Sequence, residues 1–241
     1  DHYIGDSHLT YGVHLEGHRY NPGQIDPLND NSIMMPHHID KKNMVIGALY
    51  VNNERIFGEQ FNVSAGLRVS AARNGKSYCQ IEPRVELSSS LSSNAALKAS
   101  YVRTAQYDHM LTNSTLGMPT DVWMPISKII RPQSADMVSL GVHGALNDIN
   151  VELYCETYYK VMHKVVDYRD NANLYMNDNV DLEVKEGRGR TVGLETMVKY
   201  ENNILELQTS YTLSKSERQS NDINQGRWYF AAYDQRHNLS V

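Results

Sequence analysis

Long apolar segments are missing from this 241-residue chain. Its strongest apolar run, 44–51, has only eight residues and includes Gly47, whereas a membrane helix needs ~18 consecutive apolar residues. We also expect no signal peptide, because the opening Asp1-His2-Tyr3 lacks a charged region followed by an apolar run. A chain of this kind can cross a membrane only as a β-barrel, in which every backbone polar group is paired.

Cysteine, phenylalanine, tryptophan and excess positive charge are also scarce. The two cysteines, Cys79 and Cys155, cannot build a disulfide framework, and we expect them not to pair. A formal net charge of −5 gives no electrostatic reason to expect nucleic acid. Tyrosine is frequent instead, with 16 residues against 3 Phe and 2 Trp, and its amphipathic ring suits wet surfaces and membrane interfaces.

Motifs of common enzymes are absent as well. The sequence contains no G-x-S-x-G, no H-E-x-x-H and no C-x-x-C. The segment Gly187-Arg188-Gly189-Arg190 lacks the spacing of a phosphate-binding loop, and it is better explained as the entry to a strand. We therefore expect neither an enzyme nor a bound cofactor.

Period-two alternation is the dominant positive signal. In one segment the apolar phase is Cys79, Ile81, Pro83, Val85 and Leu87, and the intervening phase is Gln80, Glu82, Arg84, Glu86 and Ser88. Successive side chains of a strand point to opposite faces, so such a segment predicts a strand with one apolar and one polar face. Similar segments predict ten strands, near 8–18, 43–54, 61–72, 79–91, 95–106, 136–146, 149–160, 190–201, 203–213 and from 236 onward.

The predicted connections alternate between short and long. Short turns fall near 55–60, 92–94, 147–148 and 202, and long links fall at 19–42, 107–135, 161–190 and 214–235. The link 73–78 is an exception, because it is short where the alternation predicts a long link. Outer-membrane barrels have short turns at one rim and long loops at the other, and their tilted strands need ~9–11 residues. The fold class that we predict is therefore all-β, an antiparallel up-and-down transmembrane barrel. A soluble or surface-exposed β-sandwich that binds a ligand remains the alternative, because its strands alternate equally well.

A series of short motifs in a fixed order resembles the barrel of TonB-dependent receptors of the Bacteroidetes lineage. They are Ala65-Gly66-Leu67-Arg68, Ile81-Glu82-Pro83-Arg84, Gly117-Met118-Pro119-Thr120-Asp121-Val122-Trp123-Met124-Pro125, Ile130-Arg131-Pro132-Gln133-Ser134-Ala135-Asp136, Glu156-Thr157-Tyr158-Tyr159-Lys160-Val161-Met162, Gly187-Arg188-Gly189-Arg190-Thr191-Val192-Gly193-Leu194-Glu195, Ser210-Tyr211-Thr212-Leu213-Ser214-Lys215-Ser216, Asn224-Gln225-Gly226-Arg227-Trp228-Tyr229 and Tyr233-Asp234-Gln235-Arg236-His237-Asn238-Leu239-Ser240. Each motif alone is weak, whereas their order and spacing over nearly the whole chain are specific.

The resemblance implies a receptor in the outer membrane of a Gram-negative bacterium that takes up a scarce nutrient: siderophore-iron, cobalamin, an oligosaccharide, a peptide or a metal chelate. It implies a barrel of about twenty-two strands, an N-terminal plug, contact with outer-membrane lipid, and coupling to TonB. The sequence departs from that pattern because it shows ten strands and neither plug nor TonB box. We therefore expect residues 1–241 to be a partial barrel whose plug and remaining strands are absent.

Two groups of polar residues are candidate contacts for a solute or metal. His14, Glu16 and His18 lie on one strand face, and imidazole and carboxylate are good ligands for zinc, copper or iron. Glu82, Arg84 and Glu86 form a charge row with which Arg68 of the neighbouring strand could pair. A hydrated inner wall explains both groups equally well.

Aromatic residues in the long links are the remaining candidates. Asp121 and Trp123 belong to one link, and Trp228 and Tyr229 belong to another. Rigid aromatics on exposed loops can stack on sugars or chelates, although loops that pack on one another would use them equally well.

Arg103 is an exception to the alternation of its predicted strand. It lies on the apolar face, in the same phase as Leu97, Ala99 and Tyr101. We expect its charged head to reach a membrane interface.

Overall fold

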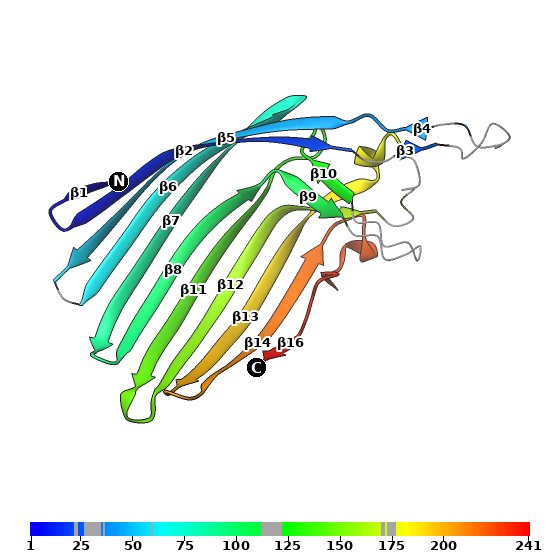
Figure 1. The fold of residues 1–241 in the computed structure, drawn as a ribbon. Helices are drawn as coiled ribbons and strands as arrows, with labels where there is room; N and C mark the ends of the chain where they lie inside the picture. The colour runs from blue at the N-terminus through cyan, green and yellow to red at the C-terminus, as the bar shows by residue number, and fades with distance from the viewer. Residues whose placement is uncertain are drawn as a thin grey trace.

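One antiparallel sheet of twelve strands makes up most of the protein in the computed structural model, which describes residues 1–21, 24–26, 35, 37–58, 60–111, 122–169, 172 and 177–241. In sheet order the strands are β1 (His2–Ile4), β2 (Ser7–Tyr20), β5 (Lys42–Phe57), β6 (Phe61–Asn74), β7 (Lys76–Ser92), β8 (Ala95–Gln106), β11 (Gln133–Leu146), β12 (Val151–Tyr168), β13 (Val184–Glu201), β14 (Glu206–Gln219) and β15 (Tyr229–Phe230), while β16 (His237–Ser240) also pairs with β14. Figure 1 shows this sheet as one curved wall of neighbouring strands.

Smaller elements lie in the connections. Strand β3 (Gln24–Ile25) pairs with β4 (His37–His38), and β9 (Asp108–Leu111) pairs with β10 (Val122–Pro125). Among the residues described, three short 3-10 helices are present: η1 (Asn147–Ile149), η2 (Val180–Leu182) and η3 (Asn224–Gly226). Within the described ranges, no helix is long and apolar enough to cross a membrane.

All ten predicted strands have a counterpart in the sheet, but several predicted boundaries at the loop end were wrong. Strand β12 continues to Tyr168, β13 already begins at Val184, and β14 continues to Gln219. A β-bulge interrupts the alternation of β12, because the register shifts between His163 and Val165 and Lys164 has a φ of 56°. The alternation then no longer marks the strand. The prediction also missed β1, which forms a hairpin with β2, and the short strands in the long links.

The short and long connections lie at opposite ends of the sheet, as predicted. The turns β5–β6, β7–β8, β11–β12 and β13–β14 gather at one end, and the connections β2–β5, β8–β11, β12–β13 and β14–β16 gather at the other. We call these the turn end and the loop end. The connection β6–β7 is a single residue, Gly75, whose φ of 70° permits a tight turn at the loop end.

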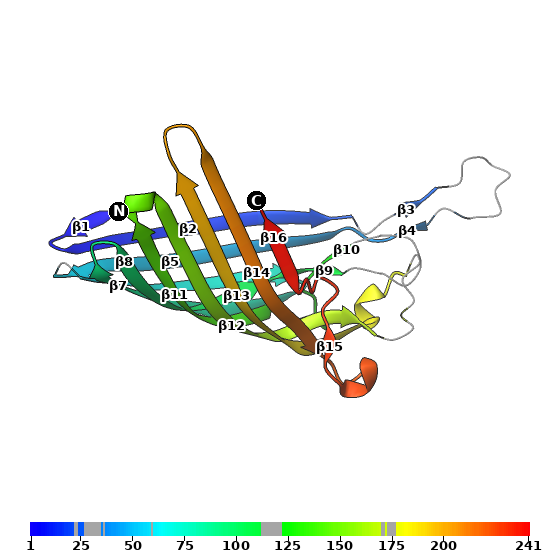
Figure 2. The ribbon, with the colours of Figure 1, turned by 90° about the horizontal axis from the view of Figure 1, so that it is seen from below.

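The two faces of the sheet differ in chemistry and in exposure. Register pairs keep each face together, since Val69 lies opposite Ile81 and Arg68 lies opposite Glu82. The face that carries Val69 and Ile81 is apolar and exposed, and the face that carries Arg68 and Glu82 is polar and more crowded. The sheet is strongly curved (Figure 2). On a curved sheet, the side chains of the concave face lie closer together than those of the convex face. We call the polar face inner and the apolar face outer.

Exposed aliphatic side chains follow the outer face from edge to edge. They include Val13, Leu15, Leu49, Val69, Ile81, Val138, Leu140, Val142, Val192, Leu194, Val198, Leu207 and Leu239. Soluble monomers rarely expose a contiguous apolar surface of this extent. The described part of the chain has no second sheet that covers this face, so the β-sandwich alternative is wrong. The architecture is that of an up-and-down β-barrel wall, with an apolar exterior and a polar interior.

Tightly packed apolar side chains occur at the loop end, where the connection β8–β11 packs on the strands. One cluster contains Leu111, Met124, Ile130, Val166 and Val184. A second contains Met44, Ala72, Tyr107 and Ile126, whose side chains are at most 5% exposed. Burial of one such aliphatic side chain contributes about 1.5–3 kcal/mol, so the two clusters hold the connection firmly against the wall.

Hydrogen bonds attach the same connection to four different strands. Tyr20 of β2 donates to the Oδ2 atom of Asp108 at 3.1 Å, and Asn74 of β6 donates to the carbonyl oxygen of Ile126 at 2.8 Å. Tyr78 of β7 donates to the carbonyl oxygen of Ser127 at 2.8 Å. Arg131 forms an ion pair with Glu186 of β13. The connection therefore bridges strands that are far apart in the sheet.

The polarity of the two faces predicts opposite effects for one substitution. Leu140→Arg places a charge on the outer face of β11 and should reduce the free energy of unfolding in a bilayer by ~2–4 kcal/mol. His143→Arg, on the inner face of the same strand, is the matched control and should change the free energy of unfolding little. Denaturant titration of the full-length protein in lipid vesicles measures both values. An equal cost for the two variants would contradict the assignment of the faces.

Candidate functional site

A cavity of about 420 Å³ lies at the loop end of the sheet, where β9, β12 and β14 meet the segment before β16. Its polar lining includes His109, Lys160, Asp167, Arg218 and Tyr233. Lys160 shares the inner phase of β12 with Tyr158 and Met162. Long connections gather at this end, so the cavity lies where a solute from outside would first meet the inner wall.

Arg218 is held in one orientation by its neighbours. Its Nη1 atom donates to the Oδ2 atom of Asp167 at 3.2 Å and to the carbonyl oxygen of Val166 at 3.4 Å. The Tyr229 hydroxyl donates to the same Asp167 oxygen at 3.0 Å, and the guanidinium carbon of Arg218 lies 5.3 Å from the centre of the Tyr233 ring. The Nε atom of Arg218 is buried and has no partner among the residues described.

His109 contributes a second buried atom without a partner. Its side chain is 4% exposed, and its Nε2 atom makes no hydrogen bond within the described ranges. Burial lowers the pKa of His109 below its usual value, and a backbone hydrogen bond with Arg131 opposes that effect only in part. The ring is therefore neutral at neutral pH. Because one ring N–H donates to the Arg131 backbone, the unpartnered Nε2 atom of the neutral ring is a hydrogen-bond acceptor.

These two atoms define what the cavity can do chemically. A buried polar atom without a partner costs about 1–3 kcal/mol, so a group that enters the cavity and satisfies it is bound favourably. Two cations, Lys160 and Arg218, face one carboxylate, Asp167. The cavity therefore suits a small polar solute with excess negative charge.

Most of the charged residues in the predicted row on β6 and β7 are paired with other residues of the wall. Arg68 pairs with Glu82 as predicted, with 3.7 Å between Nε and Oε1. Glu82 is only 8% exposed and accepts further hydrogen bonds from the Ser70 hydroxyl and from the Ala105 backbone amide. Glu86 pairs with Lys98 at 2.9 Å. Arg84 is exposed on the inner face, and a solute contact at these four positions stays a prediction.

The predicted metal candidates share the inner face of β2, but they bind one another. The two carboxylate oxygens of Glu16 lie 2.5 Å from the Nε2 atom of His14 and 2.9 Å from that of His18. No group of three or more His, Cys, Asp or Glu side chains in the described ranges is arranged to hold a metal ion. Metal contact at His14, Glu16 and His18 stays a prediction.

The aromatic candidates do not form one surface. Trp123 lies on β10 and is 49% exposed, and Asp121 lies outside the described residues. Trp228 and Tyr229 lie in the connection β14–β16, although Tyr229 begins the short strand β15 and pairs with Arg218 of β14. Solute contact at these two positions stays a prediction. Tyr229 contacts the cavity through Asp167, whereas Trp228 lies beside Arg190 of the outer face.

Sequence reasoning missed all five polar residues that define the cavity. Lys160 belongs to the polar phase of a predicted strand, and that phase was the only signal available. Asp167 and Arg218 lie in segments predicted as links, and His109 and Tyr233 lie in connections whose path the sequence does not reveal. These residues come together only through strand extension and loop folding.

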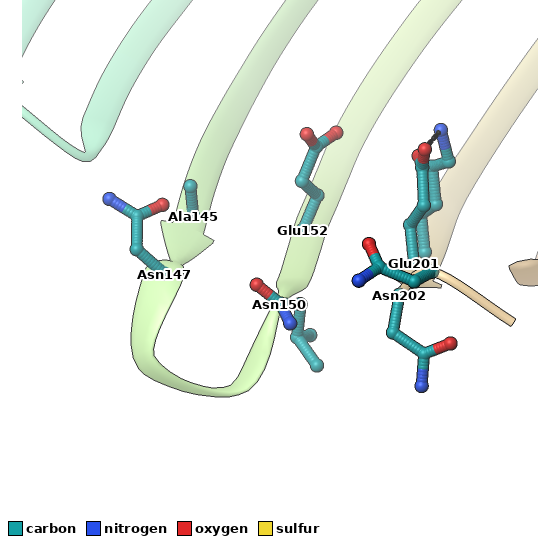
Figure 3. A pocket seen from close by; sticks show the side chains of 9 residues that line it. Ala145, Asn147, Asn150, Glu152, Glu201 and Asn202 are labelled. Carbon is teal, nitrogen blue, oxygen red and sulfur yellow. Dashed lines mark ion pairs between the residues drawn. The ribbon is translucent and has the colours of Figure 1, made fainter. Parts of the chain in front are cut away.

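A second cavity, of about 430 Å³, lies at the turn end (Figure 3). Residues of the β11–β12 and β13–β14 turns line it, among them Asn147, Asn150 and Asn202. Its lysine, Lys199, is already held in ion pairs of 2.6 Å with Glu201 and 3.2 Å with Glu206. None of the residues that line it has a buried polar side-chain atom without a partner in the described chain, so we place the candidate site in the cavity at the loop end.

The buried neutral His109 predicts a pH dependence at the loop end. Its folded-state pKa lies below the usual 6.5, so its stabilising contribution is complete above about pH 6.5 and is lost as the pH falls. Hydrogen exchange in 108–111 should therefore accelerate between pH 8 and pH 5, after correction for the intrinsic rate. Exchange in 95–102 of β8 serves as the reference, and His109→Gln should remove the dependence. Equal pH profiles for the variant and the natural protein would contradict the assignment.

No protein-family profile and no curated protein sequence matches this chain. Solved structures do match. The FrpB iron transporter from Neisseria meningitidis superimposes with a TM-score of 0.66 at 10% identity, over 93% of this chain and 35% of that one. The ferric-catecholate import receptor Fiu of E. coli K12 gives 0.64 at 14% identity, over 99% and 39%.

The ferripyoverdine receptor of the Pseudomonas aeruginosa outer membrane gives a TM-score of 0.61 at 16% identity, over 97% of this chain and 32% of that one. The chain thus spans about a third of the length of these structures. At these identities the likeness concerns the fold, and it agrees with the apolar outer face and polar inner face described above. The chain therefore has the β-barrel fold of the TonB-dependent outer-membrane receptors.

Proposed function

We propose that this chain forms part of an outer-membrane receptor that imports a small, scarce nutrient, and that it is not an enzyme. The observation that carries this proposal is the loop-end cavity, where the buried Nε2 of His109 and Nε of Arg218 have no partner in the described chain. Its position on the polar side of a wall with an apolar exterior fits a solute that arrives from outside. The fold shared with nutrient receptors supports the same function.

A metal chelate with negative charge is the solute class that we propose first. Lys160 and Arg218 outnumber Asp167. The unprotonated Nε2 atom of His109 can accept a hydrogen bond from a hydroxyl group of the chelator. The matching structures include transporters or receptors for iron, ferric catecholate and ferripyoverdine. Cobalamin, an oligosaccharide and a peptide are the competing solutes, and they carry less negative charge for these cations to bind.

The complete receptor requires partners outside this chain. The twelve-stranded sheet is open, and an unpaired strand edge is not tolerated in hydrocarbon. We propose that further strands of the natural protein close the barrel, that a plug domain fills it, and that TonB supplies energy. Outer-membrane lipid contacts the apolar outer face.

Uptake measurements test this function and its solute class together. Cells that depend on the full-length protein are given radiolabelled ferric chelates, cobalamin or oligosaccharide, with and without TonB. We expect uptake of an anionic ferric chelate that is lost without TonB. The double variant Lys160→Gln/Arg218→Gln should weaken binding about tenfold or more, since charge-assisted hydrogen bonds contribute ~1.5–3 kcal/mol each.

The matched control is Lys98→Gln/Lys199→Gln, which removes the same charge from the inner face away from the cavity. It should bind and import the chelate like the natural protein. Uptake that is independent of TonB would contradict active import. Equal loss of binding in both double variants would contradict the assignment of the cavity.

A further inference from the structure

A second feature of the wall concerns its outer face, at the boundary between the apolar band and the loop end. Four cations and two aromatic rings gather there on β13, β14 and β15 and before β16: Arg188, Arg190, Lys215, Arg236, Trp228 and Phe230. We call these six residues the rim patch. It shares no residue with the cavity of the candidate site.

The rim patch begins at the level where the apolar band ends. Outward residues of β13 run from Val198 and Leu194 through Val192 to Arg190 and Arg188. On β14 the outward series changes from Leu213 to Lys215, and Lys215 lies opposite Val192. The change from apolar to cationic residues thus occurs within one outward position on the two strands, at the depth expected for lipid headgroups.

The rings and cations of the patch are stacked on one another. The guanidinium carbon of Arg190 lies 4.2 Å from the centre of the Trp228 ring, and that of Arg188 lies 5.5 Å from it. Phe230 has the Arg236 guanidinium carbon at 5.3 Å and the Lys215 Nζ atom at 5.7 Å. Cation–π contacts of this kind fix the direction of side chains that would otherwise be mobile.

Positive charge is in excess within the patch. Glu217 accepts hydrogen bonds or ion pairs from Arg190 at 2.9 Å and from Lys215 at 2.7 Å, and it is 11% exposed. Arg236 contacts Asp234 at 3.5 Å. Arg188 is exposed, and the group to which its Nε atom donates, the Oε1 atom of Gln219 at 2.8 Å, is neutral. Four cations therefore face two carboxylates, in a chain whose net charge is −5.

We propose that the rim patch binds the phosphate group of a membrane lipid in the outer leaflet. Arg188 and Arg190 would donate to the phosphate oxygens, because guanidinium groups match phosphate geometry. Trp228 and Phe230 would lie at the level of the headgroup, where aromatic rings are favoured. The apolar band immediately below the patch meets the acyl chains of the same lipid, which favours a lipid over a soluble anion or a protein partner.

Native mass spectrometry of the full-length protein in detergent tests this site. The probe is lipid A, a glycolipid with two phosphate groups, and the reference is the same lipid after removal of both phosphates. We expect the natural protein to retain lipid A about tenfold better than the reference, and we expect the difference to shrink at high salt.

Two double variants isolate the role of the patch. Arg188→Gln/Arg190→Gln should bind lipid A about tenfold more weakly, because each cation near the headgroups contributes about 1 kcal/mol. Arg188→Lys/Arg190→Lys keeps both charges and should bind within about threefold of the natural protein. The control Lys98→Gln/Lys199→Gln, at the inner face, should bind normally.

Equal retention of lipid A by the natural protein and the Arg188→Gln/Arg190→Gln variant would overturn the proposal, and so would equal retention of lipid A and the dephosphorylated lipid. The result is independent of the proposed uptake function. The rim variants should still import the solute, whereas Lys160→Gln/Arg218→Gln should still bind lipid A.

Discussion

Backbone hydrogen bonding between neighbouring strands is the constraint on which the rest of this structure depends. In a medium without water, each unpaired backbone N–H or C=O group costs several kcal/mol, so the wall is one continuous ladder from β1 to β15. Register within the ladder keeps all residues of one phase on one face. A single alternation in the sequence thereby gives the protein an apolar exterior and a polar interior.

The loop end is built on a different principle. There the strands continue beyond the alternating segment, and the connection β8–β11 buries Leu111, Met124, Ile126 and Ile130 in two clusters. This apolar packing holds His109 beside the inner wall, near Arg218 and Asp167. The cavity and the rim patch thus lie on opposite faces of the same strand extensions, one toward the interior and one toward lipid.

The sequence predicts the wall better than it predicts the site. Alternation along Val85–Leu87 or Val138–Val142 has one cause, the difference between lipid and water, and that cause acts on every residue. The bulge at Lys164 has no such periodic signal, since a positive φ at a lysine depends on its surroundings. The predicted strand therefore ended before Asp167. On β14 the segment 214–219 is polar in both phases, so no alternation marks the part of the strand that carries Arg218. The cavity that contains both residues was therefore missed.

Arg103 illustrates the same limit. The sequence correctly predicted that Arg103 lies on the outer face. Its partner, Asp136, was not predictable, because Asp136 lies on β11, beyond the long connection β8–β11. The structure places the Arg103 Nη1 atom 3.7 Å from Asp136, which also binds His163 at 3.2 Å and the Tyr101 hydroxyl at 2.8 Å. Polar residues on the outer face are thus neutralised in groups near the loop end.

The orientation of β13 in a bilayer tests the central claim most directly. Spin labels are placed singly at 194, 195, 197 and 198 of the full-length protein, with Cys79 and Cys155 replaced by serine, and their accessibility to oxygen and to a water-soluble nickel complex is measured. We expect labels at Leu194 and Val198 to meet oxygen in lipid, whereas labels at Glu195 and Met197 should meet the nickel complex in water. Equal access of the nickel complex to all four positions would contradict a wall with one face in lipid.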